Sequence, residues 1–259
     1  MSHIQVKQHG PGGTIILNRP EKRNALTRAM IRELRQALED FHLQRSIRAV
    51  TITGAGTAFS AGMDIAEMHA TSQQDNPYPQ WHEDAELFRD LLIDMLQFPK
   101  PIIAAVNGPA FAGGAGLVLA ADLVIAGTEA RFALPEPLRG IVAGIVAPLL
   151  LFRVGGGWGA NLLLTARTID AQEGHRIGVF HEVVASDLVW ARSMELTQQC
   201  AQLAPEAVQL TKQLVNQTVG EQLETQLSAG AAISATARTT ECAMEGLRAF
   251  LEKRTPQWP

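Results

Sequence analysis

Cysteine is nearly absent from this sequence. Only Cys200 and Cys242 occur among 259 residues, and both stand in helix-like sequence. Disulfide frameworks belong to short, cysteine-rich chains, so these two residues are expected to be ordinary buried or half-buried thiols. Clusters of metal-ligating residues are missing too, as are a Walker-type phosphate loop and a nucleophile elbow. The sequence therefore predicts no metal site.

An excess of charge of one sign is also missing. The chain carries 22 basic and 26 acidic residues, which gives a net charge of −4 and a pI near 6.0. This balance argues against nucleic acid or an anionic membrane as the main partner. An anionic small molecule stays possible, because a few local lysines and arginines or a helix N-terminus can bind phosphate.

No uninterrupted apolar run is long enough to span a membrane. The stretch Pro101–Gly127 has the length, but Asn107, Asp122 and several glycines interrupt it, and Ile141–Val154 is too short. The N-terminal residues also lack the basic region and apolar run of a signal peptide. We therefore expect a cytoplasmic protein without a membrane partner.

The first half of the chain alternates strand-like and helix-like patterns. Strand patterns occur at Thr14–Leu17, Ala49–Thr53 and Ile102–Val106. Thr27 is a typical N-cap residue, and apolar residues follow it at helical spacing as far as Phe41. Alternation of this kind favours βαβ units and hence an α/β fold. The hydrophobic share of 46% is sufficient for a large core.

The second half is dominated by helical patterns. We predict a core domain over residues 1–198 and a helical C-terminal region over residues 199–259. The alanine-rich segment Leu227–Ala237 either packs against another subunit or forms the last layer of the monomer's core. The polar stretch Ala70–Pro79, rich in Gln, Asn, Ser and Pro, is predicted to be a mobile surface loop.

Two glycine-containing turns each follow a short strand pattern. The first is Gly54–Asp64 and the second is Asn107–Gly116. Glycine adopts backbone conformations that other residues avoid, so such turns can bring peptide N–H groups close to a ligand. If the two turns meet, their N–H groups can stabilise a developing negative charge as an oxyanion hole. The alternative is that Gly113 and Gly114 only permit close packing of a helix on a strand.

Around these turns the chain resembles the enoyl-CoA hydratase/isomerase superfamily, which has the crotonase fold. The matching segments are Asn18–Leu26, Phe59–Ile65, Ala104–Gly108, Ala120–Asp122, Phe132–Glu136 and Glu245–Arg254. The resemblance implies a spiral of ββα units with a C-terminal helical trimerisation region. It also implies acyl-CoA substrates, no cofactor apart from the coenzyme A of the substrate, and a homotrimer or dimer of trimers.

The resemblance also assigns candidate site residues. It implies that the N–H groups of Met63 and Gly113 bind the thioester carbonyl. Contacts to coenzyme A are implied for Lys22, Ala25, Met63, Asp64, Ile65, Ala66 and Lys253.

Hydratases of this family use two glutamates, and this chain matches only the second. That residue is Glu136, whereas the place of the first is taken by Gly116. A single glutamate suits an isomerase that moves a double bond. The segment Arg139–Pro148 instead resembles a branch that includes hydratases of branched glutaconyl-CoA thioesters, in which glycine also replaces the first glutamate. His82 and Glu86 are weaker candidates for the missing group.

Three hypotheses about function follow. The leading one is a hydratase-type lyase that acts on an α,β-unsaturated acyl-CoA thioester through a stabilised enolate. The second is a Δ3,Δ2-enoyl-CoA isomerase with Glu136 as its single base. The third is a CoA-thioester binding protein without catalytic activity.

Overall fold

The computed structural model describes residues 2–220 and 222–259. Its centre is a six-stranded sheet, in which β1 pairs antiparallel with β2 and every other neighbouring pair is parallel. In spatial order the strands are β1 (Ile4–His9), β2 (Gly12–Leu17), β3 (Ala49–Gly54), β4 (Ile102–Val106), β6 (Leu123–Gly127) and β9 (Glu182–Val184). This arrangement confirms the α/β class.

A second, three-stranded sheet lies beside the first. Its strands are β5 (Ala110–Phe111), β7 (Arg131–Ala133) and β8 (Ile169–Asp170), and β5 runs parallel to β7. Because β5 follows β4 directly, the chain crosses from one sheet to the other within the second glycine turn. The candidate site therefore lies at the junction of the two sheets.

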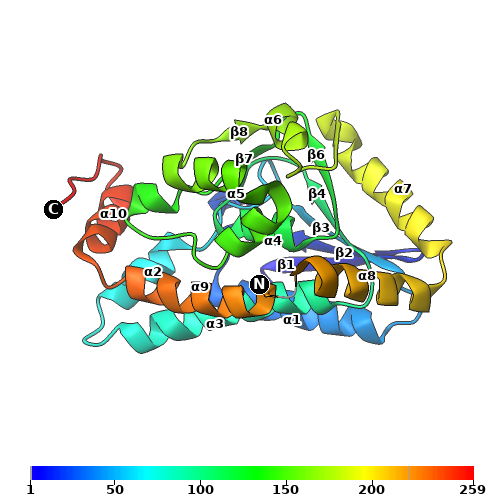
Figure 1. The fold of residues 1–259 in the computed structure, drawn as a ribbon, viewed down its shortest axis with the longest axis horizontal. Helices are drawn as coiled ribbons and strands as arrows, with labels where there is room; N and C mark the ends of the chain where they lie inside the picture. The colour runs from blue at the N-terminus through cyan, green and yellow to red at the C-terminus, as the bar shows by residue number, and fades with distance from the viewer. Residues whose placement is uncertain (1, 221) are drawn as a thin grey trace.

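Helices cover the large sheet on both faces (Figure 1). They are α1 (Arg28–Leu43), α2 (Ile65–Ser72), α3 (Tyr78–Gln97), α4 (Gly113–Ala120), α5 (Ala147–Thr165), α6 (Ala171–Arg176), α7 (Val189–Ala201), α8 (Pro205–Gly220), α9 (Leu223–Ala237) and α10 (Glu241–Leu251). Helix α7 covers one face of β3, β4 and β6, while the main core lies on the opposite face. None of the helices in the described residues combines the length and hydropathy that crossing a bilayer requires.

Helix α1 forms as its pattern predicts. The hydroxyl of Thr27 accepts a hydrogen bond from the N–H of Met30, which satisfies one of the free donors of the first turn. The predicted apolar positions, from Met30 to Phe41, are all buried against the core. The cap at Thr27 and the helical spacing of the apolar residues are therefore sufficient to predict α1 from its own sequence.

Only half of the polar stretch Ala70–Pro79 forms the loop that its composition predicts. Helix α2 continues to Ser72 and α3 begins at Tyr78, so only residues 73–77 connect two helices. Thr71 is buried, and its hydroxyl accepts a hydrogen bond from the guanidinium of Arg28 at 2.7 Å. This contact to another helix stabilises the end of α2 and outweighs the local composition.

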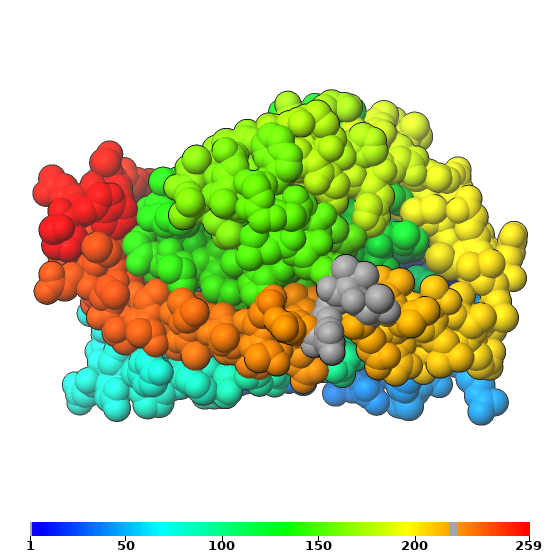
Figure 2. Space-filling view, viewed as in Figure 1, coloured from blue at the N-terminus to red at the C-terminus, as the bar shows by residue number. Residues whose placement is uncertain are grey.

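The C-terminal helices pack on the core of the same chain. Helix α9 lies along α3 and α5, and Figure 2 shows its orange surface between their cyan and green surfaces. Helix α10 packs on α2 and on the short 3₁₀ helix η2 (Glu136–Arg139). This placement agrees with a last layer of the monomer's core. The division at residue 198 stays a prediction, and that position lies within α7.

Candidate active site

The two glycine turns meet at the junction of the sheets. Leu26 forms an isolated parallel bridge with Met63, and its N–H donates to the carbonyl oxygen of Gly62 at 2.8 Å. Ser60 bridges to Ala110, and the N–H of Phe111 donates to the carbonyl oxygen of Ser60 at 2.9 Å. These bonds hold the first turn directly against the second.

Gly62 permits this close approach. Its φ is +89°, in the region that favours glycine, and a Cβ placed on it would lie 2.9 Å from the nitrogen of Gly113. The same Cβ would lie 2.6 Å from the Cβ of Ala112. Any other residue at position 62 would therefore push the two turns apart.

The N–H groups of Met63 and Gly113 remain available to a ligand. Among the described residues, neither donates a hydrogen bond to a protein acceptor. Gly113 is the first residue of α4, where N–H groups have no acceptor within the helix. Ala112, just before it, has a φ of +49°, which non-glycine residues rarely adopt and which the hydrogen bond from its N–H to Ala133 O, 3.0 Å long, helps to hold.

The packing interpretation applies to Gly114 rather than to Gly113. A Cβ on Gly114 would lie 2.5 Å from the carbonyl oxygen of Ser60, so this glycine is needed for close contact. A Cβ on Gly113 would make only ordinary contacts, at 3.4 Å or more, with Phe88, Leu26 and Met63. Gly114 is therefore required for close packing of the two turns. Gly113 is not, and the absence of its side chain leaves space beside its N–H group.

These turns open into a cavity of about 260 Å³. Of the implied site residues, Met63, Ile65, Gly113 and Glu136 line it. The others lie outside its lining: Lys22, Ala25, Asp64, Ala66 and Lys253. Lys22 and Lys253 are exposed, while Asp64 caps α2 and pairs with Arg19 at 2.9 Å.

Polar side chains that the sequence did not single out also line the cavity. Arg139 comes from η2, and its guanidinium lies over the ring of Phe250 at 4.4 Å from the ring centroid. Ser234 and Arg238 come from the end of α9. The sequence offers no local signal for these two, because only the packing of α9 on α3 places them here.

Glu136 is the first residue of η2 and one of the few carboxylates that the fold buries. Its side chain is 8% exposed, and Oε2 has no hydrogen-bond partner among the described residues. Apolar residues such as Ile141 and Val142 line the same cavity. Burial raises the pKa of Glu136 to about 7, and a backbone hydrogen bond opposes this change. The carboxyl group can therefore both accept and donate a proton near neutral pH.

The raised pKa predicts a pH-dependent gain in stability when Glu136 is replaced by Gln. Its pKa is 4.5 when unfolded and about 7 when folded, so the folded state binds more protons between these values. As the pH rises from the unfolded pKa to the folded pKa, the wild-type protein therefore loses stability relative to a variant whose side chain stays neutral. The free energy of unfolding of Glu136→Gln minus that of wild type should rise by about 3 kcal/mol from about pH 4 to about pH 8. Urea titrations measure this difference, and a value that does not change with pH would contradict the raised pKa.

The position of the absent first glutamate is filled by apolar atoms. A Cβ on Gly116 would lie 3.1 Å both from the ring of Phe88 and from a methyl group of Val146. Glu136 is the only carboxylate among the described residues that line the cavity. His82 and Glu86 pair with each other at 3.4 Å, are 43% exposed and lie outside the lining. They therefore do not replace the missing group.

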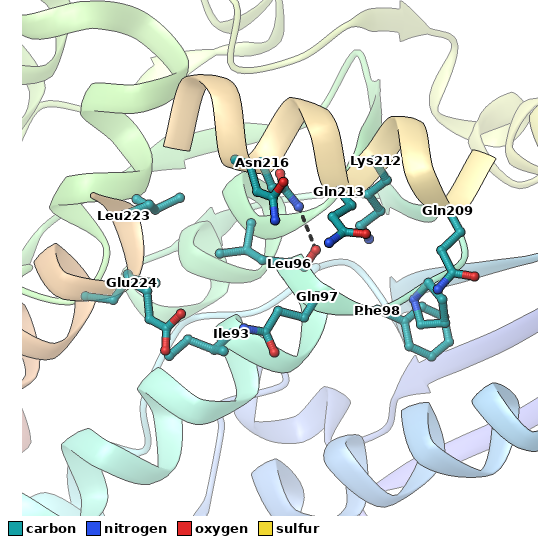
Figure 3. Close-up of a pocket in the computed structure, with 13 residues that line it drawn as sticks. Ile93, Leu96, Gln97, Phe98, Gln209, Lys212, Gln213, Asn216, Leu223 and Glu224 are labelled. Carbon is teal, nitrogen blue, oxygen red and sulfur yellow. Dashed lines mark hydrogen bonds between the residues drawn. The ribbon is translucent and has the colours of Figure 1, made fainter. Parts of the chain in front are cut away.

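A larger hollow of about 710 Å³ lies elsewhere, between α3, α8 and α9 (Figure 3). The ammonium group of Lys212 in it donates to Asp122 at 2.7 Å and to the carbonyl oxygen of Met95 at 3.0 Å. The amide of Asn216 donates to the carbonyl oxygen of Leu96 at 2.7 Å. These polar groups join α8 to the core, which is a structural role.

Comparison with known proteins agrees with this geometry. The family model described as "Enoyl-CoA hydratase/isomerase" matches residues 13–259. A Thermus thermophilus protein, whose name places it among the enoyl-CoA hydratases, is 38% identical over 98% of this chain and 100% of its own length. The 2,3-dehydroadipyl-CoA hydratase of Escherichia coli is 34% identical over 100% of this chain and 99% of its own.

The fold comparison gives the same assignment. The crystal structure of an enoyl-CoA hydratase/isomerase from Xanthobacter autotrophicus Py2 superposes with a TM-score of 0.90, at 29% identity, covering 100% of this chain and 99% of that one. The crotonase fold that the sequence resemblance implied is thereby confirmed. The chain therefore belongs to the enoyl-CoA hydratase/isomerase family and is an enzyme of the hydratase-like lyase type.

Proposed function

We propose that this enzyme adds water to the double bond of an α,β-unsaturated acyl-CoA thioester. One observation carries the proposal: the buried carboxyl of Glu136, whose Oε2 has no partner among the described residues, lines the same small cavity as the free N–H groups of Met63 and Gly113. The relatives named as hydratases support the same reaction type.

The two N–H groups would bind the oxygen of the thioester carbonyl. When water attacks the β-carbon, negative charge moves to this oxygen and an enolate forms. Donors already in place stabilise that charge more than the neutral carbonyl, and each is typically worth about 10²–10³ in rate. The N-terminus of α4 at Gly113 adds its partial positive charge.

Glu136 would carry out both proton transfers. As a carboxylate it takes a proton from water while the oxygen of that water bonds to the β-carbon. As a carboxylic acid it then gives a proton to the α-carbon, and the enolate returns to a thioester. One water is consumed and the carboxylate is regenerated, so a single group with a pKa of about 7 suffices.

Coenzyme A would extend from the cavity toward the exposed basic residues at its rim. We propose contacts to Lys22, Ala25, Asp64 and Ala66, and to Lys253 near the C-terminus. Arg23, which is exposed and lines the cavity, adds a further positive charge near this path. Exposed guanidinium and ammonium groups are suited to phosphate binding.

Isomerisation is the second candidate, and the surroundings of Gly116 favour it. Phe88 and Val146 pack tightly beside Gly116, which itself supplies no second acid or base, and a double-bond shift needs only one. In that reaction Glu136 would remove a proton from the α-carbon and return it to the γ-carbon.

Paired assays distinguish the two reactions. We expect purified enzyme to consume a 2-enoyl-CoA and form the 3-hydroxyacyl product, as followed by loss of conjugated thioester absorbance and by mass spectrometry. If a 3-enoyl-CoA is converted to its 2-enoyl isomer while a 2-enoyl-CoA is left unhydrated, the enzyme is an isomerase instead.

We also propose that the protein assembles as a homotrimer or a dimer of trimers. Helix α8 supports this, because its Leu210 and Leu214 are each 63% exposed in the single chain. Neighbouring exposed apolar side chains on one helix are typical of a surface that contacts another subunit.

A further inference from the structure

A buried guanidinium forms part of the wall of the active-site cavity. Arg238 follows the last residue of α9 and is only 4% exposed. Its Nε has no hydrogen-bond partner among the described residues, and Nη1 makes one long contact, 3.5 Å, to the carbonyl oxygen of Trp81. An arginine this buried normally has its donors satisfied by a carboxylate or several carbonyl groups.

Asp84, the carboxylate whose charge acts on Arg238, is already paired with another arginine. Both oxygens of Asp84 accept from the guanidinium of Arg28, at 2.5 and 2.7 Å, and one also accepts from Gln80 at 2.9 Å. Within the described part of the chain, no carboxylate lies within 4 Å of the guanidinium of Arg238. Two guanidiniums thus share the neighbourhood of one paired carboxylate.

Arg238 keeps its charge despite this environment. Burial lowers its pKa to about 10, Asp84 opposes that change, and Arg28 adds to it. A pKa of about 10 still leaves the group protonated at neutral pH. The cavity wall therefore carries a buried positive charge without its own counterion, which is unfavourable unless an anion enters.

A second polar group lies one helical turn earlier on α9. Ser234 lines the same cavity, is 7% exposed, and its hydroxyl has no hydrogen-bond partner among the described residues. Residues four apart lie on one face of a helix, so Ser234 and Arg238 present their donors together. Most of the remaining lining is apolar, with Met68, Phe88 and Val146 among its members.

We propose that the acyl group ends in a carboxylate, so that the substrate is the CoA monothioester of an unsaturated dicarboxylic acid. The apolar lining would contact its methylene groups, and Arg238 and Ser234 would bind its free carboxylate. This inference rests on the proposed function, because it takes the cavity to be the acyl site. The buried position of Arg238 makes it unsuited to the phosphates of coenzyme A, whose charge is better met by the exposed Arg23 and the half-buried Arg139.

Binding of unreactive thioesters tests the inference without requiring catalysis. Calorimetry with purified enzyme compares succinyl-, glutaryl- and adipyl-CoA with butyryl-, pentanoyl- and hexanoyl-CoA, which have the same chain lengths and no carboxylate. At the best length, we expect the dicarboxylic thioester to bind about 10- to 100-fold more tightly, as a charge-assisted pair in a buried site does. Equal or weaker binding of all three dicarboxylic thioesters overturns the inference.

Variants locate the effect at Arg238. In Arg238→Met the affinities for the dicarboxylic and monocarboxylic thioesters should differ by no more than about threefold. Arg238→Lys should retain part of the preference for the dicarboxylic thioester, because the positive charge remains. The matched control is Arg35→Met, which removes an arginine that pairs with Asp94 outside the cavity and should leave the preference unchanged. If Arg238→Met does not fold, the affinities of wild-type enzyme for the dicarboxylic and monocarboxylic thioesters still test the inference.

The outcome also separates this inference from the proposed function. Tight binding of a dicarboxylic thioester without hydration of its 2-enoyl form would leave the inference intact and remove the hydratase assignment. Hydration of 2-enoyl thioesters without any preference for a terminal carboxylate would support the hydratase assignment and overturn the inference about Arg238.

Discussion

Glu136→Gln should lower kcat for hydration by about 10³-fold while leaving the affinity for acyl-CoA nearly unchanged. A positioned general acid or base typically contributes 10²–10⁴ in rate, and Glu136 is the one carboxylate of the described cavity lining. Gln keeps the shape and hydrogen-bonding capacity of the side chain but cannot exchange a proton. Steady-state kinetics together with calorimetry of a saturated acyl-CoA measure the two effects separately.

The matched control is Glu86→Gln. This glutamate lies on α3, pairs with His82 and does not line the cavity, so its replacement should leave kcat within about twofold of wild type. If Glu136→Gln retained most of the wild-type kcat, a different group would be moving the proton. If wild type and variant bound acyl-CoA equally and neither turned it over, the protein would be a CoA-thioester binding protein.

Gly62→Ala should lower kcat by at least about 10²-fold, through the loss of one oxyanion donor. The new Cβ would lie 2.9 Å from the nitrogen of Gly113 and 2.6 Å from the Cβ of Ala112, so the two turns must separate. The variant should also lose about 1–3 kcal/mol of stability, because alanine is strained at a φ of +89°. Kinetics and denaturant unfolding on the same preparation give both quantities.

Gly10→Ala separates backbone strain from damage to the site. Gly10 also has a positive φ, +56°, but a Cβ there would meet only Gln198, at 3.8 Å, and Gly10 does not line the cavity. This variant should lose stability without losing kcat. If Gly62→Ala retained wild-type kcat with a similar loss of stability, the approach of the two turns would have no catalytic role.

Local patterns in the sequence predict one feature of the site, the pair of glycine turns. The glycine turns predict that two turns can meet, and the positive φ of Gly62 and the tight packing of Gly114 are backbone requirements that favour glycine. The family resemblance, and not the turns themselves, assigned Met63 and Gly113 as the donors. The cap at Thr27 is likewise encoded within four residues. Where the physical cause is local, the sequence is sufficient to predict it.

The rest of the site depends on contacts between distant segments. Arg238 joins the cavity only because α9 packs along α3, and nothing near it in the sequence indicates a buried charge. Gly116 is visible in the sequence as an absent carboxylate, but only the structure reveals that Phe88 and Val146 fill the space. The ordered end of α2 at Thr71 has the same origin, since its contact is with Arg28 on α1.

Hydrogen exchange at the α-carbon of a saturated acyl-CoA in heavy water tests the central claim most directly, because that exchange requires an enolate but no hydration. The account predicts exchange well above the uncatalysed rate with wild-type enzyme, its loss in Glu136→Gln and a large decrease in Gly62→Ala. Exchange at the uncatalysed rate with wild type, or equal exchange with all three proteins, would contradict it.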